Sequence, residues 1–380
     1  MNICIIGDGL TSLSLAKNLI NKKINVHIYY KKITGEFSSN RTIGMSKNNL
    51  EFFDKNIIKL PKKIKWEIKK IEIYSEKLKK NKILNFENRN KDLFYIIKND
   101  ELYKLLNDNL LNSKFFKKKI IKNNFFYDQL LKKNNYDLII NCDQNNSISK
   151  KYFIQKIEKD YYNFAHTTIL EHEKLKNNSA IQVFTNRGPV AFLPMSNTRT
   201  SVVCSLDTNN KNYNDNEILE LINKHNPKFK IIKNSKFISF ALKSSNLRKY
   251  YYKNILAFGE LLHKIHPLAG QGFNMTIRDI KDLLEIIHKE KISFILWCWI
   301  IIDLVIVILS LIFYVKTSTN TFLSPEQSRE LNEPCIIFSY FDYHDVWHIL
   351  SATGLFIFMT IVFFLDSNIT GMVDSNINIF

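Results

Sequence analysis

The apolar run ISFILWCWIIIDLVIVILSLIFYV, residues 292–315, most limits how this chain folds. A helix that crosses the hydrocarbon core of a bilayer needs about 20 mainly apolar residues. Only Asp303 interrupts this run. A second run, HILSATGLFIFMTIVFFL at residues 348–365, is at the short end of that range. The sequence therefore predicts two membrane helices.

The composition changes where the first run begins. Residues 292–380 contain only two basic residues, Lys316 and Arg329, beside eight acidic ones, which gives this tail a formal charge of −6. The total is +18, so residues 1–291 carry +24. Basic segments stay on the cytoplasmic side of a membrane. We therefore expect a membrane-associated protein whose first 291 residues and C-terminus are cytoplasmic.

The positive charge of the first part is mostly lysine, in short runs mixed with asparagine and isoleucine. Charge of this size also occurs on nucleic-acid-binding proteins. Because the runs do not gather on one periodic face, we interpret them as a solvated surface and expect no nucleic-acid partner. The five cysteines form no CxxC pair, so neither a disulfide framework nor a zinc knuckle is indicated.

The chain begins with a pattern typical of dinucleotide-binding folds. Residues 2–6, NICII, predict a buried parallel strand, followed by GDGLTS and the helical pattern LTSLSLAKNLINKK. Gly7 and Gly9 would permit a tight turn and a close approach of a pyrophosphate to the helix N-terminus. Ser12 replaces the usual third glycine.

The next predicted strand, INVHIYY, ends in Tyr29 and Tyr30, where dinucleotide folds usually have an acid that binds ribose. On the glycine loop and this strand alone, an ordinary strand-turn-helix unit without a nucleotide remains an alternative.

A second glycine pair lies in HPLAGQGFN, residues 266–274. Gly270 and Gly272 are two of only ten glycines in 380 residues. The preceding stretch predicts a strand with a turn at Gly259, and the following stretch predicts a helix from about Asn274. Unobstructed amides just before that helix would favour an anion or a developing negative charge. The stretch is therefore interpreted as a second cofactor contact.

These stretches resemble the FAD-dependent aromatic-ring hydroxylases, and among them the monooxygenases of ubiquinone biosynthesis. HPLAGQGFN followed by RD is similar to the signature of that subgroup. GDGLTSLSLA, RTIGMSKNNLEFF from Arg41 and FTNRGPVAFLP from Phe184 agree in the same order. The last stretch could also be plain sheet core.

The resemblance implies an α/β fold, in which a Rossmann-like βαβ FAD-binding domain is interleaved with a mainly antiparallel substrate sheet. It implies FAD as cofactor, NAD(P)H and O₂ as co-substrates, and an aromatic polyprenyl-phenol as substrate. We expect residues 1–150 to form the first part of the FAD-binding domain and 151–250 the substrate sheet. Residues 251–291 would close the FAD-binding domain, and 292–380 would form the transmembrane tail.

The resemblance also assigns the cofactor site. Its residues would be Gly7 and Gly9 at the pyrophosphate, Arg41 against the cofactor, Asp143 in a DG-like motif, Gly259 and Glu260 at the ribityl chain, and Pro267, Gly270, Gly272 and Asn274 along the isoalloxazine.

No side chain is assigned a catalytic role, because the flavin carries the chemistry in this family. His263 and His266 are interpreted as loop-packing residues. The chain departs from the family pattern at Gln144, where the family has glycine, at Glu260, where it has aspartate, and at Tyr30, where the ribose acid is absent.

The tail resembles a different family. SPEQSRELNEPCIIFSYFDYHDVWHILSATGLF is similar to the C-terminal end of the systemic RNA-interference transmembrane family, proposed double-stranded RNA channels or transporters. By that resemblance, His344 and His348 would coordinate zinc, and their i, i+4 spacing puts both on one helical face. The alternative is a pair of interfacial histidines at a helix end.

Three hypotheses for function follow from these resemblances. The leading one is a flavin monooxygenase joined to an unrelated membrane tail. The second is a membrane transport or RNA-uptake protein with a nucleotide-binding module, and the third is a nonfunctional fusion. Asp303 lies unpaired within a predicted span, which is costly in a bilayer. It indicates that the two spans derive from a larger helix bundle.

Overall fold

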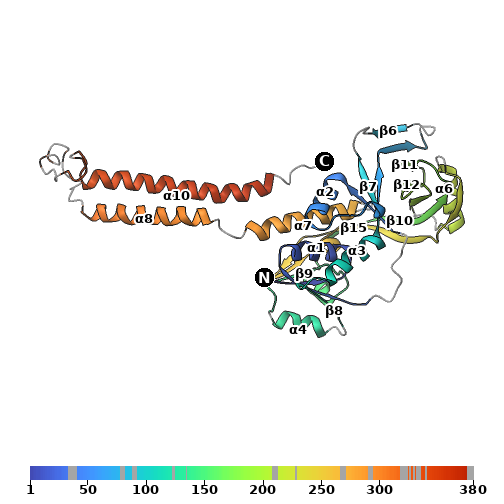
Figure 1. Ribbon diagram of the computed structural model, residues 1–380, viewed down its shortest axis with the longest axis horizontal. Helices are drawn as coiled ribbons and strands as arrows, with labels where there is room; N and C mark the ends of the chain where they lie inside the picture. Colours follow the sequence, from blue (N-terminus) through green and yellow to red (C-terminus); the bar gives the residue numbers. More distant parts are fainter. Residues whose placement is uncertain are drawn as a thin grey trace. The chain divides into compact units, whose positions relative to one another are not determined.

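We analysed a computed structural model of the chain. It describes residues 1–32, 41–77, 82–87, 92–121, 125–133, 135–207, 213–226, 229–265, 271–289, 294–316, Ser324, Gln327, Glu330, 335–338 and 340–374. These divide into two compact units, Met1–Leu284 and Glu285–Phe380, whose elements are labelled in Figure 1. Each unit is described separately below.

A mainly parallel sheet of six described strands forms one half of the first unit. Its strand order is β16-β17-β9-β1-β2-β8, and only β16 is antiparallel to its neighbour. The strands are β1 (Asn2–Ile6), β2 (Asn25–Tyr30), β8 (Phe116–Ile120), β9 (Leu138–Asn141), β16 (Tyr251–Tyr252) and β17 (Ile255–Ala257). The predicted βαβ architecture is confirmed.

Four of the described helices precede or follow these strands along the chain. They are α1 (Leu10–Asn21), which packs on α3 (Asn99–Leu111), together with α4 (Phe125–Lys133) and α5 (Ser147–Tyr152). Cys4 and Ile6 of β1 join a buried cluster with Tyr127 of α4 and Ile148 of α5. Successive side chains of a strand point to opposite faces, and Ile3 and Ile5 are also fully buried. The continuous apolar pattern of β1 thus reflects burial on both faces.

The structure contains a second, mainly antiparallel sheet, as the resemblance implies. Nine of the described strands form it in the order β18-β15-β10-β13-β12-β11-β5-β6, with β14 beside β10. Only β11 and β5 pair in parallel. The strands are β5 (Lys70–Ser75), β6 (Lys82–Glu87), β10 (Lys156–His172), β11 (Ser179–Thr185), β12 (Gly188–Pro194), β13 (Arg199–Asp207), β14 (Ile231–Asn234), β15 (Ile238–Leu247) and β18 (His263–Lys264).

This sheet therefore extends beyond residues 151–250, because β5 and β6 precede that range and β18 follows it. Helix α6 (Asp215–His225) packs on it through Ile218, Leu221 and Ile222. Val190 and Phe192 of β12 are fully buried in the same cluster. The stretch FTNRGPVAFLP therefore contributes to the core of this sheet.

A small third sheet, in the order β3-β7-β4, completes the first unit. Its strands are β3 (Thr42–Ser46), β4 (Lys65–Ile68) and β7 (Phe94–Lys98). Helix α2 (Lys47–Asn56) follows β3, and the short 3₁₀ turn η1 (Lys62–Ile64) precedes β4. A second 3₁₀ turn, η2 (Gly259–Leu261), follows β17 of the first sheet. Ile68 and Ile96 belong to one buried cluster with Leu193 of β12 and with Met195, just beyond that strand, so the two sheets share a core.

Helix α7 (Gln271–Lys289) begins earlier than the sequence predicts. The helix was expected to start at about Asn274, with Gly272 in the preceding loop, whereas Gly272 lies in the first turn. Glycine destabilises the middle of a helix through its conformational freedom, but the first turn tolerates it, so Gly272 does not mark a loop. Ile277, Ile280 and Leu284 are buried at helical spacing.

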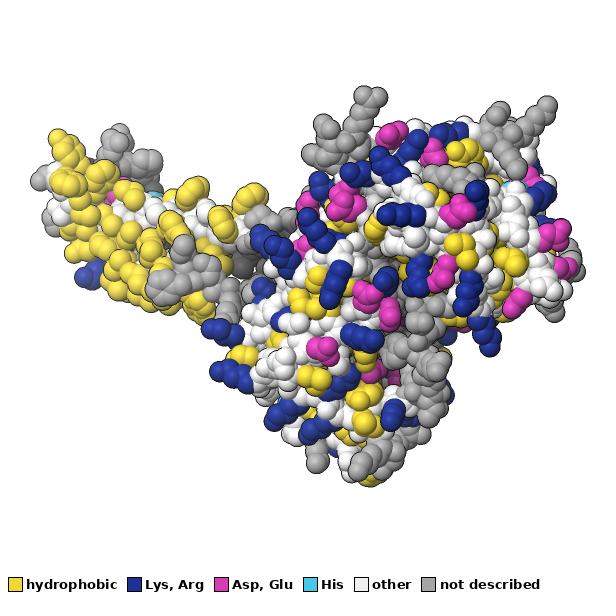
Figure 2. Space-filling model, turned by 45° about the vertical axis from the view of Figure 1, so that its right-hand side comes forward, with side chains coloured by type: hydrophobic (Ala, Val, Ile, Leu, Met, Phe, Trp, Pro, Cys, Tyr) yellow, Lys and Arg dark blue, Asp and Glu magenta, His cyan; other side chains and the backbone are white. Residues whose placement is uncertain are grey.

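The second unit contains the two expected apolar helices, α8 (Phe294–Lys316) and α10 (Tyr343–Asp374), which pack along each other. Leu296–Lys316 and Tyr343–Phe364 are long and apolar enough to cross a membrane. In an 18-residue apolar stretch of each helix, 11% and 22% of the residues, respectively, are buried. Hydrophobic side chains cover the visible face of these helices in Figure 2. This is the pattern of helices that use lipid as solvent.

Asp303 lies at the contact between the two tail helices. Its Oδ1 is 3.7 Å from the position a Cβ would take on Gly354 of α10. Among the described residues this buried oxygen has no hydrogen-bond partner. The carboxyl group thus lacks a partner in the described part of the chain, as the sequence indicated.

Gly188, the first residue of β12 after the turn from β11, is the most tightly enclosed of the described glycines. Its φ is +128°, and an added Cβ would lie 1.9 Å from the Ser205 carbonyl oxygen. We expect Gly188→Ala to destabilise the fold by about 3 kcal/mol or more, since strain and a backbone clash add. Thermal unfolding followed by circular dichroism would measure the change. Asn186→Ala, exposed in the same turn, is the control, and equal midpoints would contradict the constraint.

Candidate dinucleotide site

Three loops meet at one edge of the mainly parallel sheet. β1, β9 and β17 are neighbours and run parallel, so their carboxyl ends lie at the same edge. Gly7 follows β1, Asp143 lies two residues beyond β9, and Gly259 lies two residues beyond β17. Residues far apart in the sequence are thereby brought to the edge where ligands bind in open α/β sheets.

The loop after β1 needs a glycine at Gly7 because of its backbone conformation, and it leaves open space beside Gly9. Gly7 has a φ of +106°, and its amide donates to the Tyr29 carbonyl at 2.8 Å. Gly9 is the N-cap of α1 with extended backbone, and no atom lies within 4 Å of a Cβ built on it. No side chain caps the first amides of α1, and its first turn has no acidic residue. These amides are suited to bind an anion.

The loop after β9 is held by side-chain hydrogen bonds. Asn141 donates to Ser149 at 2.9 Å, and Asn146 caps α5 by accepting from the Ser149 amide at 2.8 Å. Asp143 Oδ1 accepts from the Asn145 amide at 2.8 Å. Removal from water raises the pKa of the neighbouring Cys142 thiol to about 12. The thiol therefore stays protonated and is no nucleophile.

The third loop begins with a glycine that approaches α1. Gly259 has a φ of +61°, and a Cβ there would lie 2.6 Å from Thr11 Cγ2. The Gln144 amide donates to the carbonyl of Glu260. Gln144, a departure from the family pattern, therefore links the second loop to the third.

Other predicted site residues lie in the region of β3, α2 and α7. Asn274 Oδ1 accepts from the Ser46 amide at 3.0 Å and from Asn49 Nδ2 at 2.8 Å, and its Nδ2 donates to the Gly44 carbonyl at 2.7 Å. Asn274 thus ties the start of α7 to β3 and α2. Arg41, just before β3, has its guanidinium 5.2 Å from the Phe240 ring centroid.

Gly272, Pro267 and Gly270 are the other residues that the sequence assigns to the start of α7. Gly272 has open space where a Cβ would stand. Pro267 and Gly270, as well as His266, lie outside the described residues.

The sequence missed two polar contacts. His263, interpreted as a packing residue, places Nε2 2.9 Å from Asp279 Oδ2 and so connects β18 to α7. Asp8, between the two glycines of the first loop, accepts from the Tyr103 hydroxyl at 3.2 Å and lies 3.5 Å from Lys118 Nζ. Both pairs join residues far apart in the chain, which no local pattern reveals.

The tail histidines lie in the first two turns of α10. The rings of His344 and His348 are 4.5 Å apart and nearly perpendicular, and Trp347 lies beside both. Among the described residues, no group of three His, Cys, Asp or Glu side chains could hold a metal ion. A zinc site needs at least three protein ligands, so the described chain supplies too few.

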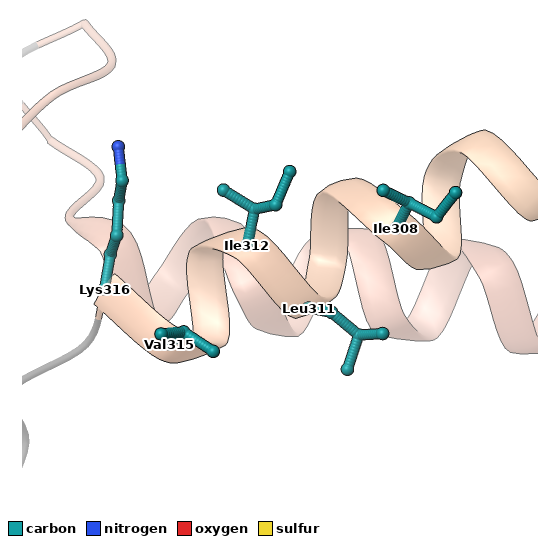
Figure 3. Close-up of a pocket in the computed structure, with 5 residues that line it drawn as sticks. All are labelled: Ile308, Leu311, Ile312, Val315 and Lys316. Atoms are coloured by element: carbon teal, nitrogen blue, oxygen red, sulfur yellow. The ribbon is translucent and has the colours of Figure 1, made fainter.

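Figure 3 shows a depression on α8 lined by Ile308, Leu311, Ile312, Val315 and Lys316. All five belong to the last turns of one helix. Four are aliphatic, and Lys316 ends the helix. The depression offers no convergent polar groups, so it is part of the apolar surface rather than a ligand site.

The first unit is similar to known flavoprotein monooxygenases. The ubiquinone biosynthesis monooxygenase COQ6 of Xenopus tropicalis is 27% identical over 198 residues, which are 41% of this chain and 42% of that protein. The chain thus spans less than half of this relative. The crystal structure of pqsL, a probable FAD-dependent monooxygenase from Pseudomonas aeruginosa, is similar with a TM-score of 0.58 at 14% identity, covering 74% of this chain and 84% of that one. At this identity the likeness establishes the fold.

The tail matches a different family. Residues 282–380 match the model for the dsRNA-gated channel SID-1. Human SID1 transmembrane family member 1 is 46% identical over 46 residues, which are 12% of this chain and 6% of that protein. The family match begins at residue 282, the compact units divide after Leu284, and the charge reverses at about residue 292. The chain therefore consists of two parts with separate relatives.

The contact between Gly259 and Thr11 gives a stability test of the site. We expect Gly259→Ala to cost about 1–3 kcal/mol, because the new methyl meets Thr11 Cγ2. Thr11→Ser removes that Cγ2, so the double variant should recover part of the loss. Thermal midpoints of the parent, both single variants and the double variant measure the coupling. Strictly additive effects would show that the two residues do not meet.

Proposed function

We propose that residues 1–291 form an FAD-dependent monooxygenase that hydroxylates an electron-rich aromatic ring, with NAD(P)H and O₂ as co-substrates. The convergence of the Gly7, Asp143 and Gly259 loops at one sheet edge carries the proposal. Similarity to the COQ6 proteins supports a phenol with a polyprenyl chain as the substrate class.

The residues at this edge fit a flavin dinucleotide. The uncapped amides of α1 and the open surface at Gly9 suit a pyrophosphate. In the proposal, Gly7 and Gly9 hold the pyrophosphate, and Asp143, Gly259 and Glu260 bind the ribityl chain. Arg41 lies against the cofactor.

The other end of the cofactor would lie at the start of α7. We assign Pro267, Gly270, Gly272 and Asn274 to the isoalloxazine. The positive end of the α7 dipole would stabilise negative charge on the reduced ring. When bound, FAD accepts a hydride from NAD(P)H and activates O₂, so the protein must orient the aromatic ring and exclude water.

The tail suggests where the enzyme would act. An apolar polyprenyl substrate dissolves in the bilayer, and α8 and α10 would hold the domain at the membrane. The charge difference between the two parts supports a cytoplasmic position for the catalytic domain.

A second candidate function rests on the match of residues 282–380 to the SID-1 model. In that case the chain would be part of a membrane transport or RNA-uptake protein, with zinc at His344 and His348 completed by groups from elsewhere. A nonfunctional fusion is the third outcome.

The visible spectrum of the full chain, purified in detergent with added FAD and then dialysed, tests the proposal. We expect the two absorption bands of bound oxidised flavin, and loss of both when NADPH or NADH is added without oxygen. Colourless protein that binds double-stranded RNA would support the transport function instead. Colourless protein without RNA affinity would support a nonfunctional fusion.

Gly9→Val separates cofactor binding from folding. Gly9 is exposed with a φ of −69° and a ψ of 174°, a backbone conformation that valine adopts. We expect the thermal midpoint to change little, since the cost at an N-cap is about 1 kcal/mol, while flavin affinity falls at least about tenfold because the side chain blocks the pyrophosphate. Flavin fluorescence titration measures the affinity.

Lys22→Val, at the exposed opposite end of the same helix, is the matched control. It should leave flavin affinity unchanged. If Gly9→Val bound flavin as tightly as Lys22→Val, the loop would not contact the cofactor.

A further inference from the structure

The end of β2 lacks the carboxylate that usually binds the ribose of a dinucleotide. Tyr29 and Tyr30 stand there instead. The structure brings another carboxylate to the same place. The Gly7 amide donates to the Tyr29 carbonyl at 2.8 Å, which holds the glycine loop against the end of β2. Asp8 is the next residue of that loop.

Lys118 of β8 connects Asp8 to Tyr30. Its Nζ is 3.5 Å from Asp8 Oδ2 and 4.7 Å from the centroid of the Tyr30 ring. The side chains of Lys118 and Asp8 are 11% and 16% exposed, so the ion pair is largely enclosed but keeps some accessible surface. The carboxylate therefore lies at the end of β2, although it comes from the glycine loop.

The hydrogen bonds around Lys118 and Asp8 decide which of these two side chains can still bind a ligand. Lys118 has three N–H donors, and it faces three acceptors: the Tyr103 hydroxyl at 3.2 Å, Asn107 Oδ1 at 2.9 Å and Asp8. Its donors are thus committed within the protein. A phosphate on the ribose would find no unused donor on Lys118.

Asp8 has acceptor capacity left. A carboxylate offers about four lone-pair positions on its two oxygens. In the described part of the chain, the contacts from Tyr103 and Lys118 both fall on Oδ2. Burial, followed by the charge of Asp8, raises the pKa of Tyr103, so its hydroxyl keeps its proton and donates. Oδ1 remains for hydroxyl groups of a ligand.

We propose that Asp8 accepts hydrogen bonds from the ribose hydroxyls in the adenosine half of the bound dinucleotide, in place of an acid at the end of β2. Lys118 and Tyr103 are positioning residues that hold the carboxylate. This inference rests on the proposed flavin function, and it predicts selection for an unphosphorylated ribose.

The test compares three ligands on the full chain in detergent: FAD, FAD with a 2′-deoxyribose in its adenosine half, and FMN, which has no adenosine half. We expect Asp8→Asn to weaken FAD binding about ten- to hundredfold, the effect of losing a charge-assisted hydrogen bond. FMN affinity should not change. The parent should prefer FAD to the deoxy analogue, and Asp8→Asn should bind both equally.

Two further variants complete the design. Asp160→Asn is the matched control, because Asp160 also pairs with a lysine, Lys243 at 2.8 Å, but in the second sheet. It should bind all three ligands as the parent does. Lys118→Met should weaken FAD binding in the parent, and should add little once Asp8→Asn is present, because both act through one carboxylate.

The outcomes are distinguishable. Unchanged FAD affinity in Asp8→Asn, in a parent that binds FAD, would overturn this inference alone. Equal loss of FAD and FMN would assign Asp8 to folding of the loop and would also overturn it. Preference of the parent for a 2′-phosphorylated dinucleotide would contradict the selection for free ribose. A parent that binds no flavin would overturn both this inference and the proposed function.

Discussion

The parallel pairing of β1 with β2 on one side and β9 on the other is the interaction on which the candidate site depends. Parallel neighbours end at the same sheet edge, so this pairing decides which loops meet, however many residues lie between them. β9 and β17 are more than 110 residues apart in sequence, yet the Phe258 amide donates to the Asn141 carbonyl at 2.9 Å. The apolar residues of β1, buried on both faces, hold the edge in place.

Glycine is scarce in this chain, which makes its positions informative. Gly7 and Gly259 could be predicted from the sequence as turns after strands, and both have positive φ. The prediction that Gly272 lies in the loop before the helix was wrong, because the first turn of a helix also tolerates glycine. The contacts of Asp8 with Lys118 and of His263 with Asp279 could not be predicted, because they depend on how distant strands and helices pack.

The two parts of the chain differ in how much of their apolar surface they bury. The first unit buries its apolar side chains between sheets and helices and exposes lysines mixed with acidic residues, as the face in Figure 2 shows. The helices of the second unit leave most of their apolar surface exposed. The sequence predicted this difference because charge and hydropathy are summed over many residues and need no tertiary contacts. It could not predict that Asp303 would face Gly354.

The central claim is that the Gly7, Asp143 and Gly259 loops form one dinucleotide site. Amide hydrogen exchange of the full chain with and without FAD tests it most directly, because each loop yields separate peptides. Our account predicts that FAD slows exchange together in three regions, residues 7–13, 142–149 and 259–263. Slowing in one region alone, or only within residues 294–316 and 343–364, would contradict it.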